Sequence, residues 1–330
     1  MDFKEIVEDF RNQKILIIGD LMVDKYIRGN VDRISPEAPV QIVDVKEEDS
    51  VPGGMGNTVR NLRALDTQVS VLSVVGDDSF GRWLYHEFEK LDLNTNGILT
   101  SETRSTTVKT RIVAADHHQL LRYDRETRKP IDTRTQMQLI EIIKDRIMTA
   151  SCVLISDYGK GVITQDVLNT AIFEAHSYKI PVIVDPKGGD FSKYESATFI
   201  TPNRKEASIA SGVNIINEYT SEQAAYILIT NHKLDGMLIT HGEEGVGLFL
   251  NKNIHGAGRI EISSQFIPAQ AREVYDVTGA GDTVLAVFGL AIASGAKPYD
   301  AACLANFAAG IVVGKVGTSS VTKEELLKIL

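Results

Sequence analysis

Short, continuously apolar runs alternate with longer amphipathic stretches along the whole of this 330-residue chain. The apolar runs predict buried strands at 14–20, 69–76, 152–157, 181–185 and 236–242. The amphipathic stretches place apolar residues at helical spacing, most clearly at 57–66, 136–148 and 221–229. This alternation is typical of an α/β fold in which helices flank a mainly parallel central sheet on both faces.

Two segments, 25–52 and 104–125, interrupt the alternation. The first holds turn residues and a strand-like stretch at 38–45, and the second predicts two alternating strands around a turn near Asp116. We expect them to form one small β-sheet inserted into a single domain spanning 1–330, because no Pro- or Ser-rich linker divides the chain. A long insertion often acts as a lid, but the pattern equally suits an ordinary antiparallel extension on the sheet edge.

Charge and hydropathy restrict the partners of this chain. A formal net charge of -9 argues against non-specific binding to nucleic acid, because the phosphate backbone repels an acidic surface. The segment 1–13 is too charged for a signal peptide, and the longest apolar run, 284–294, is too short to span a bilayer. The two cysteines, Cys152 and Cys303, lie in apolar stretches that indicate buried side chains rather than a disulfide or metal pair. We therefore expect a cytoplasmic protein that binds neither nucleic acid nor a membrane.

The stretch DVTGAGD at 276–282 places three small residues and an acid directly before an apolar, helix-length run. A glycine-rich helix start leaves backbone N–H groups unpaired, so Gly279, Ala280 and Gly281 predict a cradle that an anion can approach closely. Asp282 cannot bind an anion by charge, but it could accept a proton from a hydroxyl that attacks a phosphorus atom. The alternative is that Asp282 only caps the helix or complements its dipole.

Three further glycine-rich or polar motifs each allow two interpretations. PGGMGN at 52–57 offers Gly53, Gly54 and Asn57 as a second site of close backbone approach, or forms a simple strand-to-helix turn. TPNRKE at 201–206 offers Asn203 and Glu206 as Mg²⁺ ligands through water, or as a plain capping box. The stretch 240–249 suits the edge of a nucleotide pocket, or equally any hairpin, and its pocket candidates are Thr240, Gly242 and Gly245.

Taken in order, GDLMVD (19–24), PGGMGN, TPNRKE and DVTGAGD resemble the motifs of the ribokinase-like (PfkB) sugar kinases over essentially the whole chain. The resemblance implies that the amides of 279–281 form the anion hole and that Asp282 is the catalytic base. It also implies that Asn203 and Glu206 organise Mg²⁺ and the ATP phosphates, and that Asp24 binds sugar hydroxyls. The expected cofactors are ATP and Mg²⁺, and a requirement for a monovalent cation is left open.

Within that family, the stretches 29–45, 120–126, 155–164 and 184–188 resemble the heptose 7-phosphate kinases of lipopolysaccharide precursor synthesis. This resemblance implies ATP-dependent phosphorylation of the anomeric hydroxyl of D-glycero-β-D-manno-heptose 7-phosphate to the 1,7-bisphosphate, on the route to ADP-heptose. No H-x-G-H nucleotidyl-transfer motif occurs, so we expect a monofunctional kinase without a fused nucleotidyltransferase domain. The alternatives are a kinase of the same family for another sugar phosphate or a nucleoside, and a non-catalytic sugar-phosphate sensor.

Basic residues are the candidates for contacts with the substrate's phosphates. Lys109 and Arg111 share a strand face by the period of two, and with Arg122 and Arg125 they could clamp a distal phosphate. Edge strands also carry such residues simply to resist aggregation. Lys160 and Lys187 follow strand ends, where they could neutralise phosphate charge or remain solvated loop lysines; with Asp24, Gly53, Gly54 and Asn57 they complete the predicted substrate site. Exposed lid strands also predict a homodimer that pairs through them.

Overall fold

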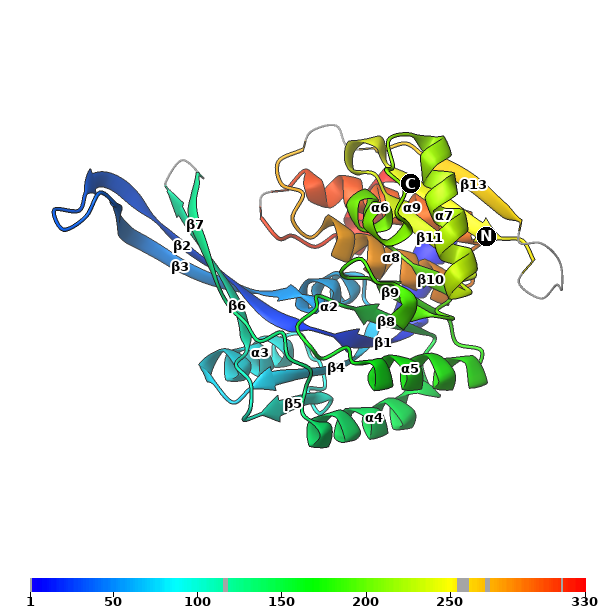
Figure 1. Cartoon of the computed structure of the whole chain (residues 1–330), viewed down its shortest axis with the longest axis horizontal. Helices are drawn as coiled ribbons and strands as arrows, with labels where there is room; N and C mark the ends of the chain where they lie inside the picture. Colours follow the sequence, from blue (N-terminus) through cyan, green and yellow to red (C-terminus); the bar gives the residue numbers. More distant parts are fainter. Residues whose placement is uncertain (1, 115–117, 254–260, 271–273, 316) are drawn as a thin grey trace.

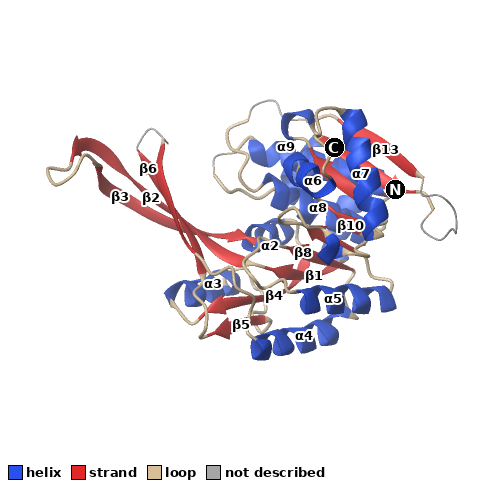
Figure 2. Cartoon of the chain, viewed as in Figure 1, coloured by secondary structure: helices blue, strands red, loops and turns tan. Residues whose placement is uncertain are grey.

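The structure is a computed structural model that describes residues 2–114, 118–253, 261–270, 274–315 and 317–330. Its body is a nine-stranded sheet with the order β13-β12-β11-β10-β9-β8-β1-β4-β5 (Figures 1 and 2). All neighbouring strands run parallel except β12 and β13, which are antiparallel to their neighbours. The strands are β1 (Lys14–Gly19), β4 (Gln68–Gly76), β5 (Ile98–Ser101), β8 (Cys152–Ser156), β9 (Val182–Asp185), β10 (Phe199–Ile200), β11 (Gly236–Thr240), β12 (Val246–Asn251) and β13 (Ile262–Ile267).

Helices cover both faces of this sheet and bury two separate apolar clusters. Along β1, Ile15 and Ile17 belong to one cluster and Leu16 and Ile18 to the other, because successive side chains of a strand point to opposite faces. The first face carries α1 (Phe3–Asp9), α2 (Met55–Ala64), α3 (Ser79–Glu89), α8 (Ala280–Ala293), α9 (Pro298–Val313) and α10 (Lys323–Ile329). The second carries α4 (Thr133–Ile147), α5 (Gln165–Ser177), α6 (Arg204–Ser211) and α7 (Glu218–His232). The predicted α/β fold class is therefore confirmed.

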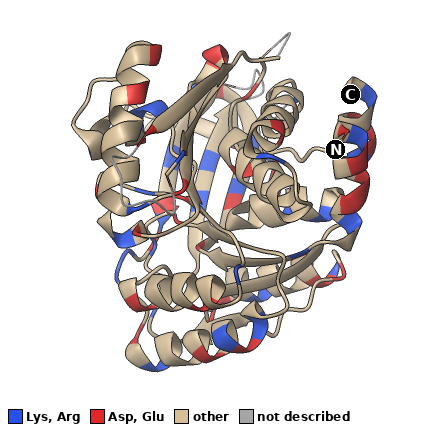
Figure 3. Ribbon diagram, turned by 90° about the vertical axis from the view of Figure 1, so that its right-hand side faces the viewer, with Lys and Arg blue, Asp and Glu red and all other residues tan. Residues whose placement is uncertain are grey.

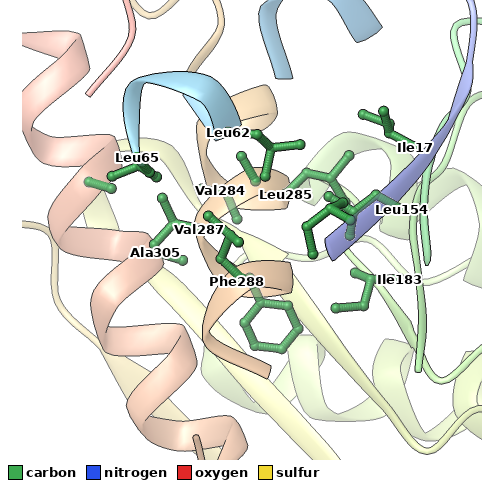
Figure 4. Packing of buried hydrophobic residues seen from close by; sticks show 14 of the residues in the cluster. Ile17, Leu62, Leu65, Leu154, Ile183, Val284, Leu285, Val287, Phe288 and Ala305 are labelled. Atoms are coloured by element: carbon green, nitrogen blue, oxygen red, sulfur yellow. The ribbon is translucent and has the colours of Figure 1, made fainter. Parts of the chain in front are cut away.

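Helix α8 is deeply buried on the first face of the sheet. Its side chains Leu285 and Phe288 lie toward Leu154 and Ile183 of the central strands, whereas Val284 points toward Leu62 of α2 (Figure 4). Burial on nearly all sides explains why the segment 284–294 is apolar without a polar face. Because α8 is fixed by this packing, the position of its first turn is fixed as well.

A second sheet of four strands projects from the body (Figure 1). Its order is β3-β2-β6-β7, with β2 parallel to β6 and the other pairs antiparallel. The strands are β2 (Leu21–Ile34), β3 (Gln41–Gly54), β6 (Thr107–Ala114) and β7 (Gln119–Arg125). The small inserted sheet was predicted, and we call these four strands the lid sheet; the turn near Asp116 lies outside the described residues.

Strand β2 is the part of the lid sheet that the sequence pattern did not indicate. Only 38–45 looked strand-like in the first insertion, whereas β2 runs without interruption from the body to beyond residue 30. Its outer half, YIRGNVDRI, carries charged and polar residues and is only partly buried. A strand without one buried face lacks the alternation on which strand prediction depends.

The two ends of the described chain meet on the body. Helices α1 and α10 pack together, Glu8 Oε2 accepts a hydrogen bond from Lys323 Nζ at 2.7 Å, and Figure 3 shows the termini side by side. Cys152 and Cys303 are both buried free thiols, as expected. Within the described part of the chain, every helix is too short or too polar to cross a membrane. Three short 3₁₀ turns complete the elements: η1 (Phe10–Asn12), η2 (Ser192–Tyr194) and η3 (Gly242–Glu244).

Candidate active site

The first turn of α8 begins with a glycine that no other residue could replace without strain. Gly279 is the N-cap residue and has a φ of 85°, in the left-handed region. A Cβ atom on Gly279 would lie 2.4 Å from Asn57 Nδ2, whereas one on Gly281 would meet nothing within 4 Å. No neighbouring atom therefore occupies the space beside Gly281, whereas Ala280 N donates to Val277 O at 3.3 Å within the turn. The anion cradle expected from the sequence stays a prediction.

Asp282 lies in the same turn, but side chains from other elements hold its carboxylate. Tyr158 Oη donates to Asp282 Oδ1 at 2.8 Å, Thr58 Oγ1 donates to Oδ1 at 3.2 Å, and Asn57 Nδ2 donates to Oδ2 at 3.0 Å. The side chain is only 5 % exposed, and this burial raises the pKa of Asp282 to about 6 against the opposing effect of the three hydrogen bonds. A carboxyl group with a pKa near the working pH is suited to accept a proton.

Two cavities meet at the start of α8. The first, of about 170 Å³, is polar and is lined by Asp185, Lys187, Asn203, Glu206, Gly281 and Asp282, among others. The second, of about 460 Å³, shares Thr240 and Gly281 with the first and is lined largely by apolar side chains. Gly242 and Gly245 also line it, so the structure brings Thr240, Gly242 and Gly245 to one cavity, and their role in binding a nucleotide stays a prediction.

Asn203 and Glu206 form the capping box that the sequence offered as one alternative. Asn203 Oδ1 accepts from Glu206 N at 2.9 Å, and Glu206 Oε2 accepts from Asn203 N at 3.2 Å. The second oxygen of Glu206 accepts a hydrogen bond from Lys187 Nζ at 2.9 Å. The capping box and a role at the polar cavity are compatible, because all three residues line that cavity.

The polar cavity concentrates negative charge. Burial raises the pKa of Asp185 well above its usual range, and the neighbouring charges of Asp282 and Glu206 raise it further. Among the residues that the structure describes, no cluster of three or more His, Cys, Asp and Glu is arranged to hold a metal ion directly. The arrangement does fit Mg²⁺, which keeps several of its waters and needs few protein oxygens.

Asp24 lies at the base of the lid sheet. It is a buried residue of β2 that pairs with Arg111 of β6, with 2.5 Å between Oδ1 and Nη1. A Cβ on Gly53 would lie 2.0 Å from Asp24 Oδ2, so the glycine leaves room for the second carboxylate oxygen. Lys109 occupies the β6 position opposite Asp24, and its Nζ lies 5.3 Å from the centroid of the Tyr158 ring.

The structure also places three other predicted site residues, Lys160, Arg122 and Gly54. Lys160 is buried and paired with Glu126. Arg122 is 51 % exposed and pairs with Asp124 of its own strand, so the structure does not bring it to either cavity. Gly54 ends β3 with a φ of 56° and is the N-cap residue of α2, the helix that supplies Asn57.

Several residues of the site were missed from the sequence. Asp20 and Tyr158 follow strands β1 and β8, Asp185 ends β9, and Thr58 neighbours the predicted Asn57. Asn306 of α9 lines the larger cavity, where its Nδ2 donates to Pro268 O at 2.8 Å. The general rule that ligands bind beyond the carboxyl ends of parallel strands would have indicated Asp20, Tyr158 and Asp185. Asn306 lies within an apolar helix and gave no comparable signal.

Comparisons with known proteins match this chain over nearly its whole length. The family model described as pfkB family carbohydrate kinase matches residues 12–325. The Bifunctional protein HldE of Syntrophotalea carbinolica is 44% identical over 327 residues, covering 98% of this chain and 64% of that protein. Its counterpart in Geobacter metallireducens is 47% identical, covering 96% of this chain and 63% of that protein. The chain thus spans less than two thirds of the length of these curated relatives.

Solved structures share the fold at low sequence identity. The ribokinase of Arabidopsis thaliana complexed with ribose and ATP is 19% identical, with a TM-score of 0.72 over 96% of this chain and 98% of that one. The tetrameric inhibited form of phosphofructokinase-2 from Escherichia coli is 16% identical, with a TM-score of 0.77 over 96% of this chain and 98% of that one. The central sheet with its helices and small second sheet is therefore a ribokinase-like fold.

The Asp24–Arg111 pair generates a stability prediction. Replacing Arg111 by Met leaves a buried carboxylate without its cation, and we expect the free energy of unfolding to fall by about 1–3 kcal/mol. Arg122, which faces Arg111 on the neighbouring strand, provides the matched control, because Arg122→Met removes an exposed cation and should cost at most about 0.5 kcal/mol. Urea unfolding at pH 7 measures both variants. Equal losses would show that the buried pair does not stabilise the base of the lid sheet.

Proposed function

Because the chain belongs to the pfkB family of carbohydrate kinases, we propose that it phosphorylates D-glycero-β-D-manno-heptose 7-phosphate with ATP. The products are the 1,7-bisphosphate and ADP, which places the enzyme in ADP-heptose and lipopolysaccharide precursor synthesis. The stretches 29–45, 120–126, 155–164 and 184–188 support this substrate, as do the relatives named HldE. The observation that carries the phosphoryl chemistry is the buried carboxylate of Asp282, held by three donors in a turn where Gly281 leaves open space.

In this mechanism, the oxygen of the anomeric hydroxyl attacks the γ-phosphorus of ATP, and Asp282 accepts the proton of that hydroxyl. The bond between that phosphorus and the bridging oxygen breaks, and ADP leaves. The backbone of 279–281 stabilises the charge on the transferring group, because Gly279 and Gly281 line the polar cavity, Ala280 lines the larger one, and Gly281 carries no side chain that would fill the space beside it. Mg²⁺, held through water by Asn203 and Glu206, would supply positive charge to the ATP phosphates. Thr240, Gly242 and Gly245 border the nucleotide at the larger cavity.

The sugar phosphate binds between the body and the lid sheet. Asp24 accepts hydroxyl hydrogen bonds through Oδ2, the oxygen beside which Gly53 leaves space, while Arg111 holds Oδ1. Gly54 turns the chain into α2, so that Asn57 reaches Asp282 and acts on the sugar through the base.

Basic residues around this site neutralise the phosphates. Arg111, Lys160 and Lys187 lie near enough to the base of the lid sheet or the polar cavity to do so. Arg122 would help to neutralise the phosphates only if closure of the lid sheet moved β7. Activity measured with and without K⁺ tests whether a monovalent cation is required. We also propose a cytoplasmic location, which the two free cysteines support.

The first test is a panel of sugar phosphates, incubated with ATP and Mg²⁺ and followed by ADP release and product mass. We expect a heptose bisphosphate, and we expect Asp282→Asn to lower kcat about 10²–10⁴-fold, because the amide cannot accept the proton. Asp145→Asn, an exposed carboxylate of α4, is the matched control and should keep full activity. Transfer only to another sugar phosphate or a nucleoside would replace the proposed substrate. No transfer to any acceptor would favour the sensor alternative.

The raised pKa of Asp282 predicts an acid limb in the pH profile. The base works only when ionised, and its pKa is about 6, so kcat should fall as the pH decreases through about 6 and level off above 7. The sugar phosphate also titrates near pH 6, and for this reason the Asp282 carboxyl should be titrated directly by ¹³C NMR in the free protein, with Asp282→Asn to assign the signal. A carboxyl that titrates near pH 4, with a flat kcat down to pH 5, would contradict the assignment of Asp282 as the base.

We further propose that a second copy of this chain covers the lid sheet. Strands β3 and β7 are its edges and leave ladder groups unpaired, and Val45 and Leu121 are exposed apolar side chains on these strands. We expect a dimeric mass at micromolar concentration by light scattering, and a monomeric mass for Leu121→Glu. Met137→Glu, which alters an exposed apolar side chain of α4, should leave the mass unchanged. A monomeric wild-type protein would rule out this interface.

A further inference from the structure

We propose that Tyr158 is a positioning residue for the catalytic carboxylate, and that it links Asp282 to the lid sheet. The inference rests on the proposed function, because it assumes that Asp282 is the base. Tyr158 follows β8, whereas Asp282 lies in the first turn of α8 and Lys109 lies on β6, so one side chain joins three separate elements.

The backbone fixes the place of Tyr158. The carboxylate of Asp20, at the end of β1, accepts hydrogen bonds from Tyr158 N at 2.9 Å, Lys160 N at 3.0 Å and Val162 N at 3.1 Å. Asp20 is itself buried, so these three bonds hold the turn after β8 in one shape. The ring of Tyr158 therefore starts from a rigid position, which a hydroxyl that orients another group requires.

The hydrogen bond from Tyr158 prevents rotation of the Asp282 carboxylate. Asn57 and Thr58 are neighbours on α2 and approach from one side, whereas Tyr158 approaches from the turn after β8. Held by α2 alone, the carboxylate could turn about its Cβ–Cγ bond with a small shift of that helix. A third donor on a different element removes this freedom.

The pattern of donors also selects the oxygen that accepts the proton. Oδ1 accepts from both Tyr158 and Thr58, whereas Oδ2 accepts from Asn57. A carboxylate offers about two acceptor positions on each oxygen. The open position therefore lies on Oδ2, and the proton of the sugar hydroxyl goes there.

The hydroxyl of Tyr158 contacts Asp282, and its ring contacts the lid sheet. Lys109 Nζ lies 5.3 Å from the ring centroid, within the range of a cation–π interaction, and Lys109 is the register partner of Asp24 on β2. The residue that orients the base thus packs against the strand pair that holds the sugar. Displacement of β6 changes the packing of the same ring that donates to Asp282.

The decisive variant is Tyr158→Phe, which removes only the hydroxyl and keeps the backbone bond to Asp20. We expect kcat to fall about 10- to 100-fold, with the KM for ATP within about twofold, because orientation of the base affects the chemical step alone. The acid limb of kcat should also move to higher pH, since this hydrogen bond favours the ionised form of Asp282. Asp24 on β2 and Asp185 on β9 lie near Asp282, and Asp157, Lys187 and Glu206 line the same cavity; all of them remain in the variant.

Two further proteins separate positioning from folding. Tyr85→Phe removes a hydroxyl that donates to Ile98 O, away from the cavities, and should leave kcat and the acid limb unchanged. Incorporation of 3-fluorotyrosine at position 158 keeps the shape of the ring but makes the phenol a stronger donor, so the acid limb should move to lower pH. This second measurement applies even if Tyr158→Phe does not fold.

The outcomes distinguish the inference from the proposed function. If Asp282→Asn is inactive while both changes at Tyr158 leave kcat and the acid limb unmoved, the positioning role is wrong and the base stands. A merely structural tyrosine would lower the melting temperature of Tyr158→Phe without moving the acid limb, which also overturns the inference. If Asp282→Asn remains active, Asp282 is not the base and the inference fails with it, while the kinase activity stands. The proposed function itself fails only if the wild-type protein transfers phosphate to no acceptor of the panel.

Discussion

The site depends on one buried carboxylate at the point where the sheet order reverses. From β1 the chain builds β4 and β5 on one side and then returns to place β8, β9, β10 and β11 on the other. Ligands of open α/β sheets bind at such a switch point, beyond the carboxyl ends of the strands. Here Asp20 follows β1 and accepts three backbone N–H groups of the turn after β8. Burial raises the pKa of Asp20, while these bonds act against that effect, so the turn and the carboxylate stabilise each other.

The same strand ends gather more negative charge than the nearby lysines neutralise. Asp157 pairs with Lys193 and Glu206 pairs with Lys187, while the pKa of Asp185 is raised well above normal, first by burial and then by the neighbouring charges of Asp282 and Glu206. Such a site is unfavourable in the free protein and becomes favourable when a cation enters, because the cation reverses the electrostatic effect of each neighbouring carboxylate. We propose that an anionic nucleotide binds with its cation at the start of α8, where Gly281 leaves space beside the turn, and not against the carboxylates. Such a separation would let a chain of net charge -9 accommodate phosphorylated substrates.

Local patterns in the sequence were sufficient to predict the fold class and the start of α8. Buried parallel strands are continuously apolar, and Gly279 and Gly281 stand out in any chain, so both features are visible without tertiary contacts. The role of Asn57 was less accessible, since only the folded chain shows its amide directed at Asp282. Tyr158 was missed for the same reason: its hydroxyl meets a residue 124 positions away, and no short pattern records that distance. The role of Arg122 stays a prediction, and strand periodicity does not reveal that its ion-pair partner is Asp124 on the same strand.

Movement of the lid sheet cannot be independent of the base. Strand β3 ends at Gly54, where a left-handed residue starts α2 without an intervening loop. Three residues later the same helix presents Asn57, and then Thr58, to the two oxygens of Asp282. We infer that a rotation of β3 about this glycine would displace two donors of the carboxylate, while the backbone of Tyr158 stays held by Asp20. If Asp282 is the base, as proposed, its orientation would then depend on the position of the lid sheet relative to the body.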